Sequence, residues 1–167
     1  VAEYYGYPPA STAEGLKKFR GIRRRFETIG RLGGAELIAD YAHHPREIAA
    51  AVQTAKEFCR GRLFVIFQPH TYSRTRLLFD DFVSVLSQVE NLVLYKTYPA
   101  REYFDASGSA LTLSEHLPDS LYIESVRELE IYLRCSLSAG DVALFLGAGD
   151  IYFAGKQVLL GRNNAEA

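Results

Sequence analysis

The chain has 167 residues, of which 48% are hydrophobic and 23% charged, and its formal net charge is -1 at pH 7. This length and composition indicate one globular domain that can bury a core, with room for a short extra piece. A charge so close to neutral gives no reason to bind nucleic acid, and no apolar run approaches the roughly 20 residues of a membrane span, so we expect neither as a partner.

The first residues and the cysteines bear on origin and compartment. The chain starts with Val1 and lacks both an initiator Met and the basic and apolar regions of a signal peptide, so we expect a piece of a longer protein. Cys59 and Cys135 lie in apolar helical patterns without CxxC or Cys/His spacing, which argues against a disulfide framework or a zinc site. We interpret them as buried thiols in a reducing cytoplasm.

The first elements are a helix end and a hairpin. Residues 12–20 have the pattern of a helix that Gly21 stops, and we interpret them as the tail of a preceding domain. Residues 25–32 and 35–41 are predicted strands, joined by Gly33-Gly34, because two glycines tolerate the positive φ angles of a tight hairpin turn.

The rest of the chain alternates helix and strand. The expected elements are a helix from Pro45 to Gly61, a strand over 63–67, a helix capped by Ser73, a strand over 92–95, a short helix over 109–117, a strand over 121–123, a helix from the capping box Ser125/Glu128, a strand over 142–146 and a helix after Gly149. This alternation predicts an α/β fold with a mostly parallel, helix-covered sheet and an antiparallel hairpin at its start.

Ligands of such sheets bind at the carboxyl ends of the strands, so the loops after the strands are the candidate site. The first loop, residues 40–45, places Asp40, His43 and His44 just before a helix. Adjacent histidines can bind a metal, but no third ligand stands at motif spacing, so we expect no metal site. The alternative is that His44 caps the helix and that the other imidazole lies on the surface.

The second loop, residues 68–76, places hydroxyls, His70 and two guanidinium groups, those of Arg74 and Arg76, around a helix start. Free backbone N–H groups there favour an anion, and arginine is electrostatically misplaced in a first turn unless something negative lies nearby. Two interpretations stay open, namely contact with a carboxylate or phosphate and a salt bridge to Asp80 or Asp81.

The third loop contains Gly147, Gly149 and Asp150 and resembles half of a dinucleotide fingerprint, but Tyr152 occupies the place of the third glycine. Close packing of helix on strand is the alternative explanation of these glycines. The chain has no P-loop and no nucleophile elbow of the GxSxG type. We therefore expect binding groups here and no catalytic residue.

Five ordered motifs carry a family resemblance. They are Phe19-Arg20-Gly21-Ile22-Arg23-Arg24-Arg25-Phe26, Asp40-Tyr41-Ala42-His43-His44-Pro45, Gln68-Pro69-His70-Thr71-Tyr72-Ser73-Arg74-Thr75-Arg76, Tyr98-Pro99-Ala100-Arg101-Glu102 and Gly147-Ala148-Gly149-Asp150-Ile151. In order and spacing they closely resemble the UDP-N-acetylmuramate:L-alanine ligases of the Mur ligase family.

The resemblance implies a three-domain enzyme of which this chain is the C-terminal domain, a Rossmann-like three-layer sandwich. Residues 1–24 would be the tail of the central ATPase domain, and residues 25–167 the C-terminal domain. The implied activity is ATP-dependent joining of L-alanine to UDP-N-acetylmuramate in peptidoglycan synthesis, in the bacterial cytoplasm. Mg²⁺ would be required, with its ligands in the absent part, and the N-terminal and central domains of the same polypeptide would be the partners. Alone, the chain would be inactive.

Site roles also follow from the resemblance, position by position. Arg25 matches the arginine that contacts ATP, and Asp40 the aspartate that holds the ribose hydroxyls. Tyr41, His43 and Arg74 match positions that line the amino-acid site, with Arg74 suited to the L-alanine carboxylate because a guanidinium complements a carboxylate.

The chain departs from the commonest family pattern at two positions. Ala39 stands where many members have a second aspartate, and Thr71 where many have arginine. If that arginine normally helps to bind substrate, Arg74 or Arg76 must carry more of the binding here.

Two alternatives remain. The ligase that attaches a recycled murein tripeptide to the same UDP-sugar belongs to the same superfamily, but its members usually lack the QPH(T/R)YSR run. A free-standing nucleotide- or anion-binding module is the alternative from a different class. A P-loop upstream in the complete gene would favour a ligase, and a start codon directly before Val1 would favour the module.

Overall fold

A computed structural model describes residues 1–18 and 21–161. In chain order the elements are α1 (Pro9–Lys18), β1 (Glu27–Leu32), β2 (Ala35–Asp40), α2 (Pro45–Phe58), β3 (Leu63–Phe67), α3 (Tyr72–Leu77), α4 (Phe79–Leu86), β4 (Asn91–Tyr95), the 3-10 helix η1 (Ala106–Gly108), α5 (Ala110–Glu115), β5 (Leu121–Ile123), α6 (Val126–Ser136), β6 (Val142–Leu146) and α7 (Ile151–Leu160).

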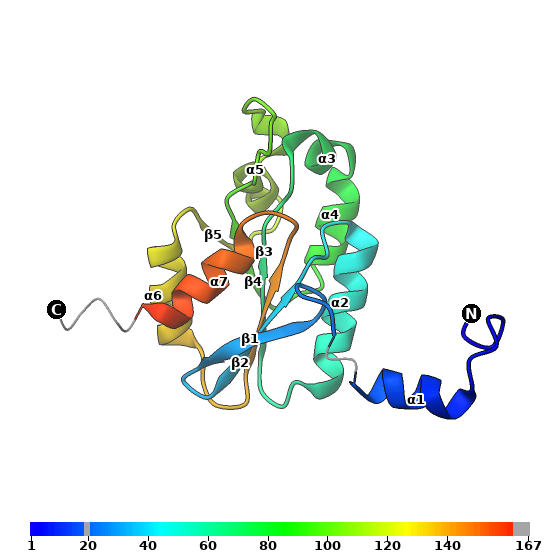
Figure 1. The fold of residues 1–167 in the computed structure, drawn as a ribbon. Coiled ribbons are helices and arrows are strands. Elements are labelled where there is room, and N and C mark those ends of the chain that lie inside the picture. The colour runs from blue at the N-terminus through cyan, green and yellow to red at the C-terminus, as the bar shows by residue number, and fades with distance from the viewer. Residues whose placement is uncertain (19–20, 162–167) are drawn as a thin grey trace.

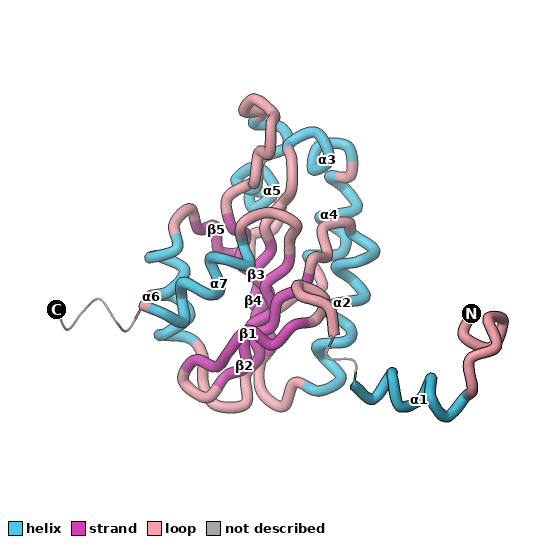
Figure 2. The backbone as a smooth tube through the Cα atoms, in the orientation of Figure 1, coloured by secondary structure: helices cyan, strands magenta, loops and turns pink. Residues whose placement is uncertain are grey.

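The strands form one six-stranded sheet in the order β1-β2-β6-β3-β4-β5. All neighbouring pairs are parallel except β1 and β2, which are antiparallel. Helices cover both faces of the sheet (Figure 1), and the tube view separates the central strands from the two helical layers (Figure 2). The predicted α/β three-layer sandwich, mostly parallel with an antiparallel hairpin at its start, is confirmed.

The hairpin turns at Gly33 and Gly34, whose φ angles of 59° and 88° are positive as predicted. Because β1 runs antiparallel to β2, its first residue, Glu27, pairs with Ala39 near the end of β2. The chain that enters β1 therefore lies at the edge of the sheet where the parallel strands end.

Each face of the sheet has its own hydrophobic core. On β3, Val65 and Phe67 face the cluster formed with α2, α4 and α5, whereas Phe64 and Ile66 face the cluster formed with α6 and α7. The four side chains are at most 2% exposed. A strand covered on both faces explains why residues 63–67 are a continuous apolar run.

The helix expected from Ser73 differs from the prediction in two respects. Thr71 is the N-cap, its hydroxyl accepting from Arg74 N, so the assignment of Ser73 as the cap is wrong. The helix is also interrupted at Leu78, which separates α3 from α4. Leu78 and Phe79 both pack against the core of this face, and neighbours in a continuous helix lie about 100° apart, so the interruption lets both turn inward.

Helix α2 ends at Phe58, three residues before the expected stop at Gly61, and Cys59 is its C-cap. The Ser125/Glu128 capping box at the start of α6 is confirmed. Both cysteines are free, but Cys59 is only partly buried and Cys135 is exposed, so the expectation of buried thiols is wrong for Cys135.

Helix α1 buries none of its residues and lies away from the sheet (Figure 1). The helix expected to end at residue 20 extends here over Pro9–Lys18, while residues 19–20 lie outside the described part. No helix within the described residues is long and apolar enough to cross a membrane.

Candidate functional site

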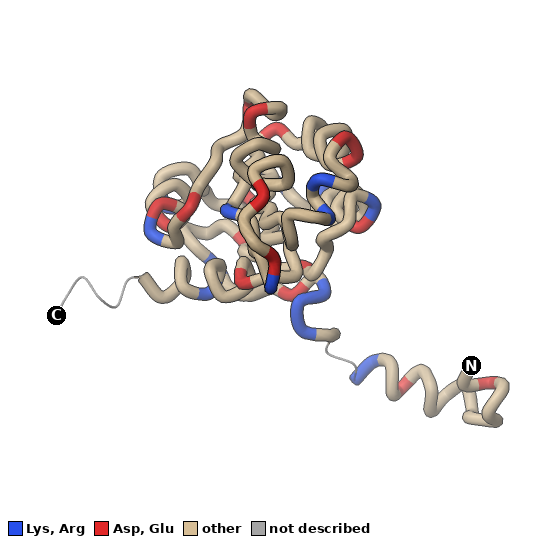
Figure 3. The backbone as a smooth tube through the Cα atoms, turned by 90° about the horizontal axis from the view of Figure 1, so that it is seen from above, with Lys and Arg blue, Asp and Glu red and all other residues tan. Residues whose placement is uncertain are grey.

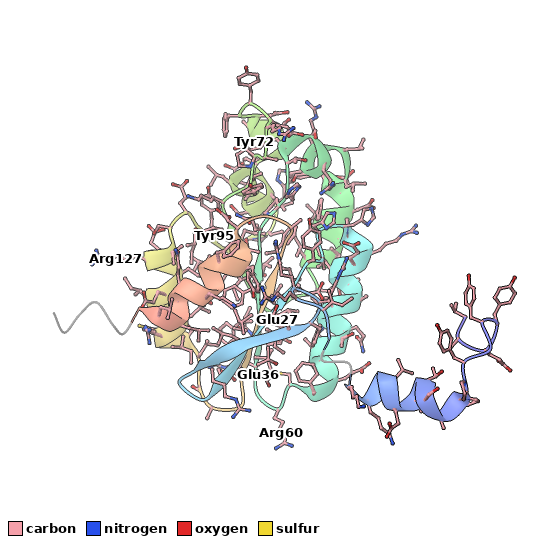
Figure 4. The ribbon with its side chains drawn as sticks, in the orientation of Figure 1. Glu27, Glu36, Arg60, Tyr72, Tyr95 and Arg127 are labelled. Atoms are coloured by element: carbon pink, nitrogen blue, oxygen red, sulfur yellow. The ribbon has the colours of Figure 1, made fainter. Side chains whose placement is uncertain are left out.

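The carboxyl edge of the sheet brings the three predicted loops together. The loops after β2, β6 and β3 are neighbours because these strands are adjacent and parallel, and the segment before β1 joins them. In Figure 4, Tyr72, which follows β3, marks this edge at the top, and Arg60, which precedes β3, marks the opposite edge at the bottom.

Asp40 connects two of these segments. Its Oδ2 accepts a hydrogen bond from Phe26 N and its Oδ1 from Ala42 N, each at 2.8 Å. The carboxylate thereby holds the entry to β1 against the loop after β2. A carboxylate has about four acceptor positions, so this half-buried group keeps capacity for further hydrogen-bond donors.

Five other predicted residues follow one another across the edge. The Arg25 guanidinium carbon lies 5.5 Å from the centroid of the Tyr41 ring, and the ring centroids of Tyr41 and His43 lie 5.4 Å apart. His43 faces the His70 ring at 6.1 Å, and Arg74 Nη1 lies 3.4 Å from His70 Nδ1. Arginine groups therefore stand at both ends of an aromatic row, and the whole row, arginines included, is built from three separate segments.

His70 lies between a stacked ring and a cation. Its ring stacks on Tyr98 at 5.4 Å, and a backbone bond of 2.9 Å from Thr71 N to Tyr98 O fixes the two loops together. Burial lowers the pKa of His70, and the nearby positive charge of Arg74 and the proximity of His43 lower it further. A neutral imidazole can accept the hydrogen bond from Arg74 at Nδ1.

The two arginines of the second loop have different partners. Arg76 is exposed and pairs with Asp105 at 3.0 Å. This loop therefore forms a salt bridge, but the partner is Asp105, so the predicted partners Asp80 and Asp81 are wrong. Arg74 is half-buried and forms no ion pair with any residue of the described part. Its guanidinium group is therefore available for an anion.

The first turn of α3 already has an anion from the same chain. Ser73 N donates to Glu102 Oε2 at 2.9 Å, and the Ser73 hydroxyl also donates to this carboxylate. These bonds lower the pKa of Glu102. The Ser73 donors at this helix start are therefore occupied by a carboxylate of the same chain, and Arg74 is the group left for a ligand.

The glycine loop after β6 is shaped by close internal packing. A Cβ atom at Gly149 would lie 2.5 Å from Gln68 Oε1 and 2.6 Å from Tyr98 Cγ, and one at Gly147 would lie 2.9 Å from Gln68 O. Neither position tolerates a side chain without movement of these neighbours. The packing alternative therefore accounts for both glycines.

Gln68 joins this loop to β3 and β4. The side chain is 1% exposed, accepts from Ile151 N at 3.0 Å, and donates to Asp150 Oδ1 at 2.6 Å and to Lys96 O at 3.2 Å. Asp150 is thus held by Gln68 at the start of α7. Sequence reasoning missed Gln68, although a polar residue directly after a buried apolar strand is a usable signal.

His44 is the N-cap of α2. Its Nδ1 accepts from Arg46 N at 3.3 Å, and Glu47 accepts from His44 N at 3.3 Å, which together form a capping box. The capping alternative for His44 is therefore confirmed. Within residues 1–18 and 21–161, no group of three or more His, Cys, Asp or Glu side chains could hold a metal ion.

Arg24 has no predicted role beyond its place in the first family motif, yet its Nη2 donates to Gly147 O at 3.2 Å and to Gly149 O at 2.8 Å. The cluster of residues 23–25 forms a blue stretch next to the grey residues in Figure 3, and acidic and basic segments alternate over the rest of that view.

A hollow of about 570 Å³ lies at the amino edge of the sheet, between the end of α4 and the loop before β5. Its lining includes Leu92, at the start of β4, and Ser120, just before β5. Because parallel strands start at the edge opposite to the one where they end, this hollow lies far from the row that joins Arg25 to Arg74. The chemistry gathered at the carboxyl edge, rather than this hollow, identifies the candidate site.

Comparisons with known proteins match most of the chain. Residues 24–149 match the family described as "Mur ligase, glutamate ligase domain". The chain is 42% identical over 149 residues to the UDP-N-acetylmuramate--L-alanine ligase of Lachnospira eligens, an alignment that covers 87% of this chain and 32% of that protein. The chain thus spans about a third of the length of the curated relatives it matches.

Two solved structures are similar. The crystal structure of the UDP-N-acetylmuramate-alanine ligase of Thermotoga maritima aligns with a TM-score of 0.77 and 29% identity, over 99% of this chain and 36% of that chain. A murein peptide ligase of Psychrobacter arcticus aligns with a TM-score of 0.63 and 19% identity, over 99% and 35%. The second likeness shows the fold alone.

The lowered pKa of His70 predicts a pH effect on stability. Below the ordinary pKa of histidine, about 6.5, the unfolded chain takes up a proton that the folded chain resists, so stability falls as the pH falls through this range. Replacing His70 by Gln removes this contribution. In urea unfolding between about pH 7.5 and about pH 5.5, His70→Gln should lose less stability than the wild type.

His116→Gln, a change at an exposed histidine away from this edge, is the matched control and should keep the wild-type slope. An identical slope for His70→Gln and the wild type would contradict the environment described for His70.

Proposed function

The chain belongs to the Mur ligase family, and from this membership we propose that it is the C-terminal domain of a bacterial ATP-dependent UDP-N-acetylmuramate:L-alanine ligase. The relatives that carry this name match nearly the whole chain but are about three times as long. The proposed domain contributes binding groups to a site that it completes with other domains of the same polypeptide, and is inactive alone.

The observation that carries the proposal is the row of side chains from Arg25 to Arg74 at the carboxyl edge. Ligands of open α/β sheets bind at this edge. At one end, the exposed Arg25 guanidinium lies over Tyr41, close to the segment that Asp40 binds through Phe26 N. A guanidinium complements phosphate and a carboxylate accepts hydroxyl protons, so we assign Arg25 to ATP phosphate and Asp40 to the ribose hydroxyls.

We assign the other end of the row to L-alanine. Arg74 is half-buried, without an ion pair among the described residues, and next to His70. Arg76 is paired with Asp105, and Thr71 caps α3, so neither is placed to replace Arg74. Tyr41 and His43 would form the wall between the nucleotide and the amino acid.

The proposed reaction joins a carboxylate to an amine with ATP. The carboxylate of UDP-N-acetylmuramate attacks the γ-phosphate of ATP, giving an acyl phosphate and ADP, and the L-alanine amine then displaces phosphate to form the amide. In this scheme Arg74 orients L-alanine through its carboxylate, which leaves the amine free to attack. Mg²⁺ would neutralise phosphate charge, and we place its ligands in the rest of the polypeptide.

We also propose that residues 1–24 are the tail of the central ATPase domain and that residues 25–167 form the C-terminal domain. The lack of buried residues in α1 and the start of the family match at residue 24 support a boundary near residue 24. An exposed free cysteine at Cys135 suits a reducing compartment such as the bacterial cytoplasm.

The murein tripeptide ligase is the weaker alternative. The similarity to the alanine ligase of Thermotoga maritima is higher in both identity and TM-score than that to the murein peptide ligase of Psychrobacter arcticus. The presence of the run from Gln68 to Arg76 also favours L-alanine as the amine.

Activity provides the first test of this function. The full-length protein should form the amide only when UDP-N-acetylmuramate, L-alanine and ATP are all present, with phosphate release in equal amount. The 167-residue chain should show none of this turnover, because it lacks a P-loop. A full-length protein that ligates a murein tripeptide and ignores L-alanine would refute the assignment, and so would turnover by the chain alone.

The two ends of the row should separate kinetically in the full-length enzyme. Arg74→Ala should raise the KM for L-alanine roughly 10- to 100-fold and change the KM for ATP little, because a lost charge-assisted bond costs about 1.5–3 kcal/mol. Asp40→Ala should show the reverse pattern. Steady-state kinetics with each substrate varied in turn measures both values.

Arg76→Ala serves as the control for Arg74→Ala, since Arg76 is exposed and paired with Asp105. Equal effects of the Arg74 and Arg76 changes on L-alanine would remove Arg74 from the amino-acid site.

A further inference from the structure

The adjacent residues Arg24 and Arg25 differ in solvent exposure. Arg25 is exposed, whereas Arg24 is half-buried. Arg24 and Phe26 both have left-handed backbone angles, with φ of 59° and 50°, and this geometry turns successive side chains in different directions. Non-glycine residues in this region cost about 1–3 kcal/mol each and persist where the surrounding structure holds them.

Backbone hydrogen bonds hold this segment. Arg24 O accepts from Tyr41 N at 2.7 Å, and Arg24 N donates to Glu27 Oε2 at 2.7 Å. The other oxygen of Glu27 accepts from the Tyr152 hydroxyl at 3.1 Å. The main chain of Arg24 is therefore connected to the loop after β2 directly and to α7 through Glu27.

The Arg24 side chain reaches the glycine loop. Its Nη2 bridges the carbonyl groups of Gly147 and Gly149, at 3.2 Å and 2.8 Å. Both glycines are buried, so these carbonyls need partners from the protein. The guanidinium carbon also lies 4.8 Å from the Tyr41 ring centroid and 5.5 Å from that of Tyr152.

Arg24 thus joins three segments of the carboxyl edge: the entry to β1, the loop that carries Asp40 and Tyr41, and the glycine loop with the start of α7. Its Nε is buried without a hydrogen-bond partner among the described residues, a cost of about 1–3 kcal/mol. This unmet donor and the left-handed backbone are two separate costs at one residue. Such local costs are expected where function shapes the structure.

We propose that Arg24 is a positioning residue that couples the Asp40–Tyr41 loop to the glycine loop and so sets the affinity for the nucleotide held by Arg25 and Asp40. This inference rests on the proposed function. Arg24 acts through its neighbours, while Arg25 contacts phosphate. Lysine is not equivalent to Arg24, because a compact ammonium group cannot place one donor nitrogen between the two carbonyls and a flat cation close to both the Tyr41 and the Tyr152 ring.

The kinetic test uses the full-length enzyme with Arg24→Ala, Arg24→Lys and, as the matched control, the exposed neighbour change Arg23→Ala. Arg24→Ala should raise the KM for ATP about tenfold or more, with a smaller change in kcat, and Arg24→Lys should recover little of this loss. Millimolar methylguanidinium should partly restore the ATP KM of Arg24→Ala, which a merely destabilised protein would not show. Arg23→Ala should match the wild type.

Hydrogen exchange provides a test that needs no catalysis. In full-length protein, Arg24→Ala and Arg24→Lys should speed amide exchange in the peptides over residues 40–42 and 147–151, and leave those over the sheet strands unchanged. Faster amide exchange at both loops supports the coupling by Arg24 whether or not the protein is this ligase. Failure of the ligase assignment is seen separately, as a wild type without ligase activity.

Three results would overturn the inference. One is an ATP KM for Arg24→Ala equal to that of Arg23→Ala, with unchanged exchange in both loops. Another is faster exchange confined to one loop. The third is unfolding or general loss of protection in both Arg24 variants, which would make Arg24 a residue that stabilises the whole fold.

Discussion

The candidate site depends on the attachment of the antiparallel strand β1 to the end of β2. Asp40 supports this attachment, because its two carboxylate oxygens accept from Phe26 N and Ala42 N, beside the backbone bond from Tyr41 N to Arg24 O. The bonds place Arg25 beside Tyr41 and bring the segment before β1 to the edge where the parallel strands end. A residue expected to bind a nucleotide therefore also holds the loop geometry, so structure and binding are linked through one side chain.

The sequence predicted the sheet and its carboxyl edge because both depend on strong local signals. Continuous apolar runs such as residues 63–67 mark strands covered on both faces, and Gly33 with Gly34 marks the hairpin. Once strands and helices alternate, the loops that follow the strands must share one edge. The contiguity of Tyr41, His43 and Arg74 therefore follows from topology, whereas their binding roles came from the family resemblance.

What the sequence did not predict depends on long-range contacts. The capping of the first turn of α3 by Glu102 joins residues 29 positions apart, and Gln68, directly after β3, bonds Ile151 beyond the end of the neighbouring strand β6. The direction of the Arg24 side chain follows from the left-handed backbone angles at Arg24 and Phe26. The sequence does not indicate these angles, because neither residue is glycine, the residue that favours them. Conversely, the glycines of the third loop look like a ligand motif in sequence but are required by packing against Gln68 and Tyr98.

A structure of the full-length protein with a non-hydrolysable ATP analogue and L-alanine tests the central claim most directly. The account predicts a nucleotide that lies against the carboxyl edge of this domain, with its ribose hydroxyls within hydrogen-bond distance of Asp40 and a phosphate in contact with Arg25. A fully bound complex in which this edge faces solvent, with Asp40 and Arg25 beyond contact of the nucleotide, would contradict it.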